Sequence, residues 1–70
     1  SYMGKLFMEM GEYARAEQFF LGMLQDSSVR SQPRRLVRVH NGLGANYMNK
    51  GEFLKALEHY QQALQVSLTY

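Results

Sequence analysis

Cysteine and tryptophan are absent from this chain of 70 residues, and proline occurs once. Without cysteine the chain can form neither a disulfide framework nor a thiolate zinc site. Apolar runs such as Phe19-Phe20-Leu21 are far shorter than the roughly 20 residues that cross a membrane, and no basic-then-apolar leader opens the chain. We therefore expect a soluble, cytoplasmic protein that folds without disulfides or metals.

The positive charge is unevenly distributed along the chain. The formal net charge is only +2, yet Arg30, Arg34, Arg35 and Arg38 supply half of the eight lysines and arginines. A uniformly basic protein would favour nucleic acid or an anionic membrane as partner. A single basic cluster on an otherwise balanced chain indicates an acidic partner instead.

Apolar residues recur at helical spacing in four segments, which are separated by glycine or by a polar linker. Gly11 and Gly51 stand where two of these helices would stop, and Pro33 suits the first turn of a helix. The pattern predicts one small all-α domain (1–70) with two antiparallel helical hairpins, 1–26 and 34–70, joined by a linker at 27–33. The four predicted helices are Ser1–Met10, Glu12–Asp26, Arg34–Lys50 and Glu52–Leu68.

The two hairpins repeat each other at a shift of 40 residues. Eight of the thirty comparable positions are identical, including Gly11 with Gly51 and Ala16 with Ala56. Conservative pairs fall where helices should pack: Met3 with Leu43, Phe7 with Tyr47, Tyr13 with Phe53, and Phe20 with Tyr60. The chain is therefore predicted to contain one helical unit twice.

Small and large residues alternate in a characteristic way through the second hairpin. The pattern is Leu-Gly-x-x-Tyr from Leu43, followed by Gly-x-Phe-x-x-Ala-x-x-x-Tyr-x-x-Ala from Gly51. This spacing resembles the tetratricopeptide repeat (TPR), whose usual period is about 34 residues. The longer period seen here resembles the repeats of Pins-type adaptors and rapsyn, and comes near those of kinesin light chains. The resemblance implies a fragment of an α-solenoid that serves as a scaffold or adaptor and binds other proteins.

Several positions depart from the family pattern. Met23 replaces the small residue found as Ala63, Leu68 stands where a proline often closes the repeat, and His40 stands where the family often has a larger residue. The first repeat also lacks the start of its first helix.

No arrangement of residues predicts catalysis or a bound cofactor. His40 and His59, the only histidines, have no Asp or Glu three or four positions away to complete a metal or acid–base site. We interpret His40 as a core or edge residue and His59 as a packing residue. The linker serines have no paired base and suit helix capping. The sequence therefore predicts a protein that is not an enzyme and has no cofactor and no metal.

The candidate binding residues form a polar stripe on the third predicted helix. They recur at i, i+4, i+7, i+11 and i+15, beside the packing positions. In the family that this chain resembles, such a stripe lines a concave groove that receives a peptide. The predicted partner-binding residues are Arg34, Arg38, Asn41, Ala45 and Asn49, with Lys5, Met8 and Glu9 at the matching positions of the first repeat.

The charge on this stripe limits the choice of ligand. The dicarboxylate clamp of chaperone-binding relatives needs Lys and Asn one turn apart, whereas this chain has Asn41 and Ala45 there. An acidic extended or helical segment that pairs with Arg34 and Arg38 fits better.

Three alternatives stay open at this point. The stripe can be a solvated face without a ligand. The chain can be a structural repeat fragment that stacks or self-associates through the apolar residues of its ends, Met3, Leu6, Val66 and Leu68. Weak binding of single-stranded RNA through the arginines is the third alternative, although the aromatic residues sit mainly at packing positions rather than on the basic face.

Overall fold

The computed structural model describes residues 2–70, and within them it contains helices and no strands. The elements are α1 (Tyr2–Glu9), α2 (Tyr13–Gln25), α3 (Ser27–Arg30), α4 (Pro33–Lys50) and α5 (Phe53–Thr69). The prediction of an all-α chain with four longer helices is confirmed. The short helix α3, which lies in the predicted linker, was not predicted.

Two glycines end helices in the same way at equivalent places. Gly11 and Gly51 adopt the left-handed conformation, with φ of 76° and 84°, which residues with a Cβ atom rarely adopt. In each case the next amide reaches back into the helix: Glu12 N–H donates to Phe7 O and Glu52 N–H donates to Tyr47 O, both over 2.8 Å. The chain reverses after each glycine, so α1 pairs with α2 and α4 pairs with α5.

Asp26 explains why the linker contains a helix. Its backbone is extended, and its carboxylate accepts hydrogen bonds of 2.9 Å from both the backbone amide and the hydroxyl of Ser28. These bonds, the backbone one first, lower the pKa of Asp26. A carboxylate at this position satisfies an amide that the first turn of a helix leaves free, so it favours a helical turn.

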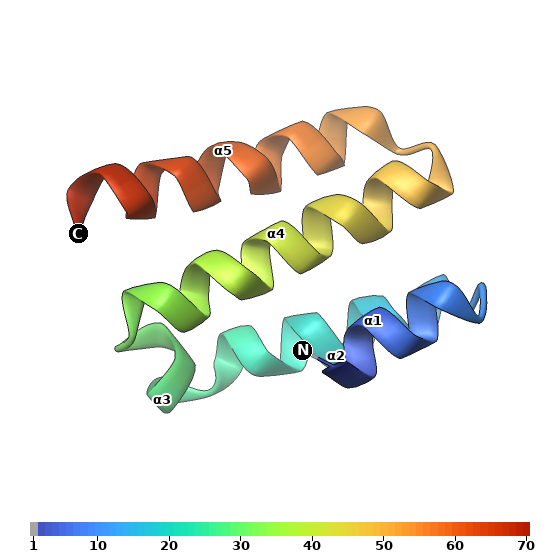
Figure 1. Cartoon of the computed structure of the whole chain (residues 1–70), viewed down its shortest axis with the longest axis horizontal. Helices are drawn as coiled ribbons and strands as arrows, with labels where there is room; N and C mark the ends of the chain where they lie inside the picture. The colour runs from blue at the N-terminus through green and yellow to red at the C-terminus, as the bar shows by residue number, and fades with distance from the viewer. Residues whose placement is uncertain (1) are drawn as a thin grey trace.

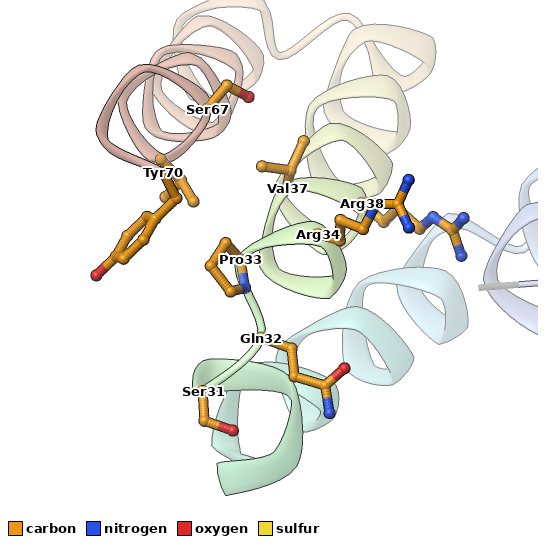
Figure 2. A pocket seen from close by; sticks show the side chains of 9 residues that line it. Ser31, Gln32, Pro33, Arg34, Val37, Arg38, Ser67 and Tyr70 are labelled. Carbon is orange, nitrogen blue, oxygen red and sulfur yellow. The ribbon is translucent and has the colours of Figure 1, made fainter.

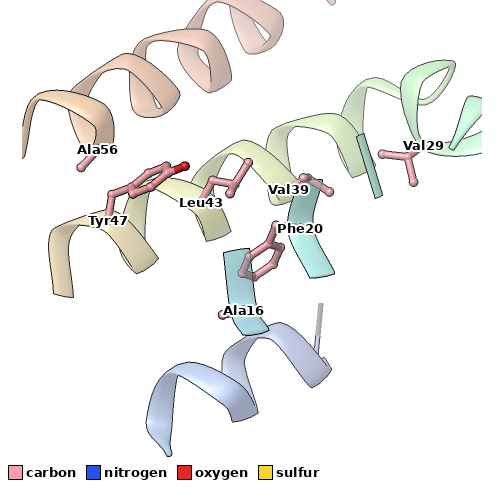
Figure 3. Packing of buried hydrophobic residues seen from close by; sticks show 7 residues of the cluster. All are labelled: Ala16, Phe20, Val29, Val39, Leu43, Tyr47 and Ala56. Atoms are coloured by element: carbon pink, nitrogen blue, oxygen red, sulfur yellow. The ribbon is translucent and has the colours of Figure 1, made fainter. Parts of the chain in front are cut away.

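Helix α4 is the central element of the fold (Figure 1). It lies between α5 on one side and the α1–α2 hairpin on the other, and it is in contact with α1, α2, α3 and α5. The core accordingly gathers along α4, where Val39 and Leu43 have no exposed surface. Figure 3 shows Phe20 of α2 in the same cluster as these residues.

The ring of Phe20 occupies space that two glycines leave open. Only 1% of Phe20 is exposed. A Cβ atom at Gly42 of α4 would lie 2.5 Å from the ring, and one at Gly4 of α1 would also overlap it. Phe20 therefore contacts the backbone of both hairpins at once. With a residue larger than glycine at position 4 or 42, α1 or α4 could not approach the ring as closely.

Two polar contacts connect α4 to α2 beside this ring. Asn46 is fully buried and donates from Nδ2 to the carbonyl oxygen of Tyr13 over 3.1 Å. The hydroxyl of Tyr47 donates to Glu17 over 2.5 Å, and burial together with this bond raises the pKa of Tyr47 to about 12. Hydrogen bonds to buried groups require particular geometry, so these contacts specify the register between the hairpins.

Replacing Gly42 and Gly22 separately by alanine tests this packing. Gly22 also lies inside a helix, but no atom lies within 4 Å of a Cβ atom added there. We expect Gly22→Ala to stabilise the fold by about 0.5 to 1 kcal/mol through helix propensity. Gly42→Ala should instead destabilise it by about 1 to 2 kcal/mol, because overpacking against the buried ring exceeds the same gain in propensity. Urea denaturation measures both changes. Equal stabilisation by the two substitutions would contradict close packing at Gly42.

Candidate protein-binding groove

A groove lies between α1 and α4, with Phe20 of α2 among its lining residues. Its cavity has a volume of about 360 Å³, and its lining consists of Lys5, Met8, Phe20, Arg38, Asn41 and Gly42. Four of these, Lys5, Met8, Arg38 and Asn41, belong to the predicted partner-binding set. The structure therefore brings together half of that set from two helices that are far apart in the sequence.

Helical spacing explains how each wall of the groove is formed. Lys5 and Met8 lie three residues apart on α1, and Arg38 and Asn41 lie three residues apart on α4, so each pair shares one helix face. The two faces meet over Phe20 because Gly4 and Gly42 allow α1 and α4 to approach its ring. The groove thus combines an apolar part, Met8 and Phe20, with two basic side chains and an amide.

Among the residues that the structure describes, the basic side chains of this region have no carboxylate partner. The ion pairs among residues 2–70 involve only Arg15, Lys50 and Lys55 as cations. Lys5, Arg34 and Arg38 are all exposed. Their charges are therefore available to an acidic ligand, and hydrogen bonds from charged donors contribute more than neutral ones.

The other half of the predicted set lies outside the lining of this groove. Glu9, Ala45 and Asn49 are not among its lining residues. Arg34 lines a different cleft together with Arg38, where the start of α4 faces the end of α5 (Figure 2). Figure 2 shows the side chains of Arg34 and Arg38 projecting on the side of α4 away from Tyr70. The polar stripe on one helix predicted candidate binding residues, but it did not predict which of them line the same groove.

The cleft between α4 and α5 was not predicted. It has a volume of about 720 Å³, and Pro33, Val37, Val66 and Tyr70 give it apolar walls. The sequence offered one signal for it, because Val66 was expected to leave apolar surface at the end of the chain. Nothing in the sequence indicated that Val37 and Tyr70 would line a cleft, because this depends on the distance between α4 and α5 at this end of the hairpin.

The two histidines form a pair that sequence reasoning also missed. His40 is 7% exposed, which confirms its interpretation as a core residue, but its Nδ1 lies 3.0 Å from the Nδ1 of His59. Among the described residues, no group of three or more His, Cys, Asp or Glu side chains could hold a metal ion. A turn at Gly51 places the two histidines on adjacent helices, but helical periodicity alone does not specify whether they lie level with each other.

The arrangement belongs to the class of tandem helical-hairpin repeats. Residues 37–69, slightly less than half of the chain, match the family model described as tetratricopeptide repeat. The part of the chain formed by α5 and most of α4 therefore matches a tetratricopeptide repeat. Such repeats generally bind other proteins and are generally not catalytic.

No curated protein and no solved structure matches the chain significantly. The particular likeness to Pins-type adaptors, rapsyn and kinesin light chains therefore stays a prediction. In residues 2–70, none of the helices is long and apolar enough to cross a membrane.

Proposed function

We propose that the groove between α1 and α4 binds an acidic segment of another protein, with one apolar side chain of that segment against Met8. The observation that carries this proposal is the placement of Lys5 and Arg38 on opposite walls of one hollow, both without an ion-pair partner among the described residues. Asn41 adds a donor and an acceptor beside them. The protein would act as a binding module and not as an enzyme.

The size of the groove limits what it can accept. A hollow of about 360 Å³ lies near the lower end of the range for ligand pockets, which is about 300 Å³. It suits one side chain and its neighbouring backbone better than a whole helix. An extended acidic segment therefore fits the groove better than a helical one, and residues on its two flanks would reach Lys5 and Arg38.

A binding assay with charge-matched variants tests this proposal. The probe is a fluorescent peptide in which glutamates flank a single leucine, and the readout is its anisotropy. Arg38→Ala should weaken binding about tenfold, because a hydrogen bond to a charged group contributes roughly 1.5 kcal/mol. Arg30→Ala removes the same charge from α3, outside the groove lining, and should change binding less than about twofold.

Two results would contradict the proposal. Equal losses for the Arg38 and Arg30 variants would mean that only net charge attracts the peptide. Tighter binding of single-stranded RNA than of the peptide would favour the RNA alternative. Phe20 is almost completely buried, so the groove offers no exposed aromatic face on which a base could stack.

Self-association is a second candidate function, favoured by the exposed face of α5. Its exposed apolar residues are Phe53, Leu54, Leu57, Leu64 and Leu68. Tyr60 packs against Gly44 in the way that Phe20 packs against Gly4, while Phe20 also has Gly42 of the other hairpin against it. If a second copy stacked on α5 as the second hairpin stacks on the first, its Tyr2 would face Tyr60 of the first copy. Tyr2 is the equivalent of Gly42 because the two lie 40 residues apart, which is one repeat period.

Sedimentation over about a hundredfold concentration range tests this candidate. We expect concentration-dependent association that weakens when Val66 and Leu68 are both replaced by polar residues, with helicity retained. Tyr2→Gly should strengthen association if copies stack as the two hairpins do, since Tyr2 is bulky and 76% exposed. A strict monomer for all three proteins would rule out self-association.

A further inference from the structure

His40 of α4 and His59 of α5 face each other inside the second hairpin. Their Nδ1 atoms lie 3.0 Å apart, and their ring planes are inclined by 27° with centroids 5.3 Å apart. His59 also lies against Tyr47, whose ring stacks on it with centroids 5.5 Å apart. The two imidazoles therefore belong to the contact that holds α5 against α4.

The short distance between the two Nδ1 atoms limits how many protons the pair can hold. With both rings neutral, one Nδ1–H donates to the lone pair of the other Nδ1. With one ring protonated, the same bond forms with a charged donor. With both rings protonated, two N–H groups point at each other and two positive charges stand in contact. The second proton can bind only if the rings move apart.

Charged groups on the neighbouring elements do not remove this conflict. Burial lowers the pKa of both histidines, and the charge of His59 lowers that of His40 further. Glu58 of α5 and Glu17 of α2 act in the opposite direction on His59. Glu17 already accepts a hydrogen bond from Tyr47 of α4, and Lys55 of α5 lies over the ring of Tyr47. Glu52, at the start of α5, is paired with Lys50 and Lys55.

We propose that the His40–His59 pair is an acid-sensitive contact, and that binding of its second proton loosens α5 from α4. The proposal is independent of the groove and of its ligand. Sequence comparison between the two hairpins supports a special role for the pair, because the position that matches His59 in the first hairpin holds Phe19, which cannot titrate.

The direction of the pH effect follows from proton binding in the two states. Both histidines bind protons more weakly in the folded chain than at their ordinary pKa of 6.5. Below pH 6.5 the unfolded chain consequently holds more protons than the folded one. Stability is therefore complete above this pH and is lost as the pH falls. Each extra proton changes the folding equilibrium constant by up to about tenfold per pH unit.

A histidine NMR titration of the wild type, His40→Phe and His59→Phe tests the coupling between the rings. We expect the wild-type pair to titrate in two separate steps, the second well below the ordinary range. In each variant the remaining histidine should titrate in one step, at a higher pH than that second step. Independent titration of the two rings in the wild type, unchanged in the variants, would overturn the proposal.

Hydrogen exchange between about pH 7.5 and pH 5.5, above the range where most carboxylates titrate, tests the loosening itself. Exchange rates are first corrected for the intrinsic rate at each pH. Lowering the pH should then increase the opening of α5 in the wild type several-fold more than it increases the opening of α2. His59→Phe, which copies the first hairpin, should reduce this difference. Equal pH dependence of α2 and α5 in the wild type would contradict the proposal even if both variants failed to fold.

Discussion

The contact of one phenylalanine ring with two glycines holds this fold together. Phe20 lies between Gly4 of its own hairpin and Gly42 of the other. Each glycine brings a helix backbone against the ring, so α1, α2 and α4 share one core rather than forming two separate pairs. The buried Asn46 amide and the Tyr47–Glu17 bond then specify the register around this contact. A chain of 70 residues has little other apolar surface with which to join two hairpins.

The same contact builds the proposed binding site. Phe20 is both the residue that joins the hairpins and part of the apolar lining of the groove, while Lys5 and Arg38 stand on the two helices that it brings together. Affinity for a partner should therefore depend on how tightly the hairpins pack, even though most core residues never touch the ligand. The second hairpin is proposed to be sensitive to acid as well, because two histidines face each other in the contact between α4 and α5.

Local signals in the sequence predicted the helices, and longer-range geometry decided what was missed. Gly11 and Gly51 marked their turns because left-handed backbone favours glycine, and the 40-residue shift revealed the repeat. The short helix α3 was not predicted because its four residues are too few to show a helical periodicity of apolar residues. The sequence pattern grouped Arg34 and Asn49 with Arg38 because all three belong to one stripe that runs the length of α4. Only Arg38 of these three lines the groove, because the groove forms where α1 lies beside α4. The His40–His59 pair depends on the axial offset of α4 and α5, which periodicity does not specify.

Native-state hydrogen exchange of the wild-type chain at neutral pH tests most directly whether Phe20 joins the two hairpins into one unit. If the shared core holds, the slowest amides of α1–α2 and those of α4–α5 will exchange through one global opening with a common free energy. Replacing Phe20 by alanine should then separate the two sets, since truncating a buried phenylalanine costs roughly 3 to 5 kcal/mol. Two distinct opening free energies in the wild type, unaffected by Phe20→Ala, would show that the hairpins are independent and would contradict the account.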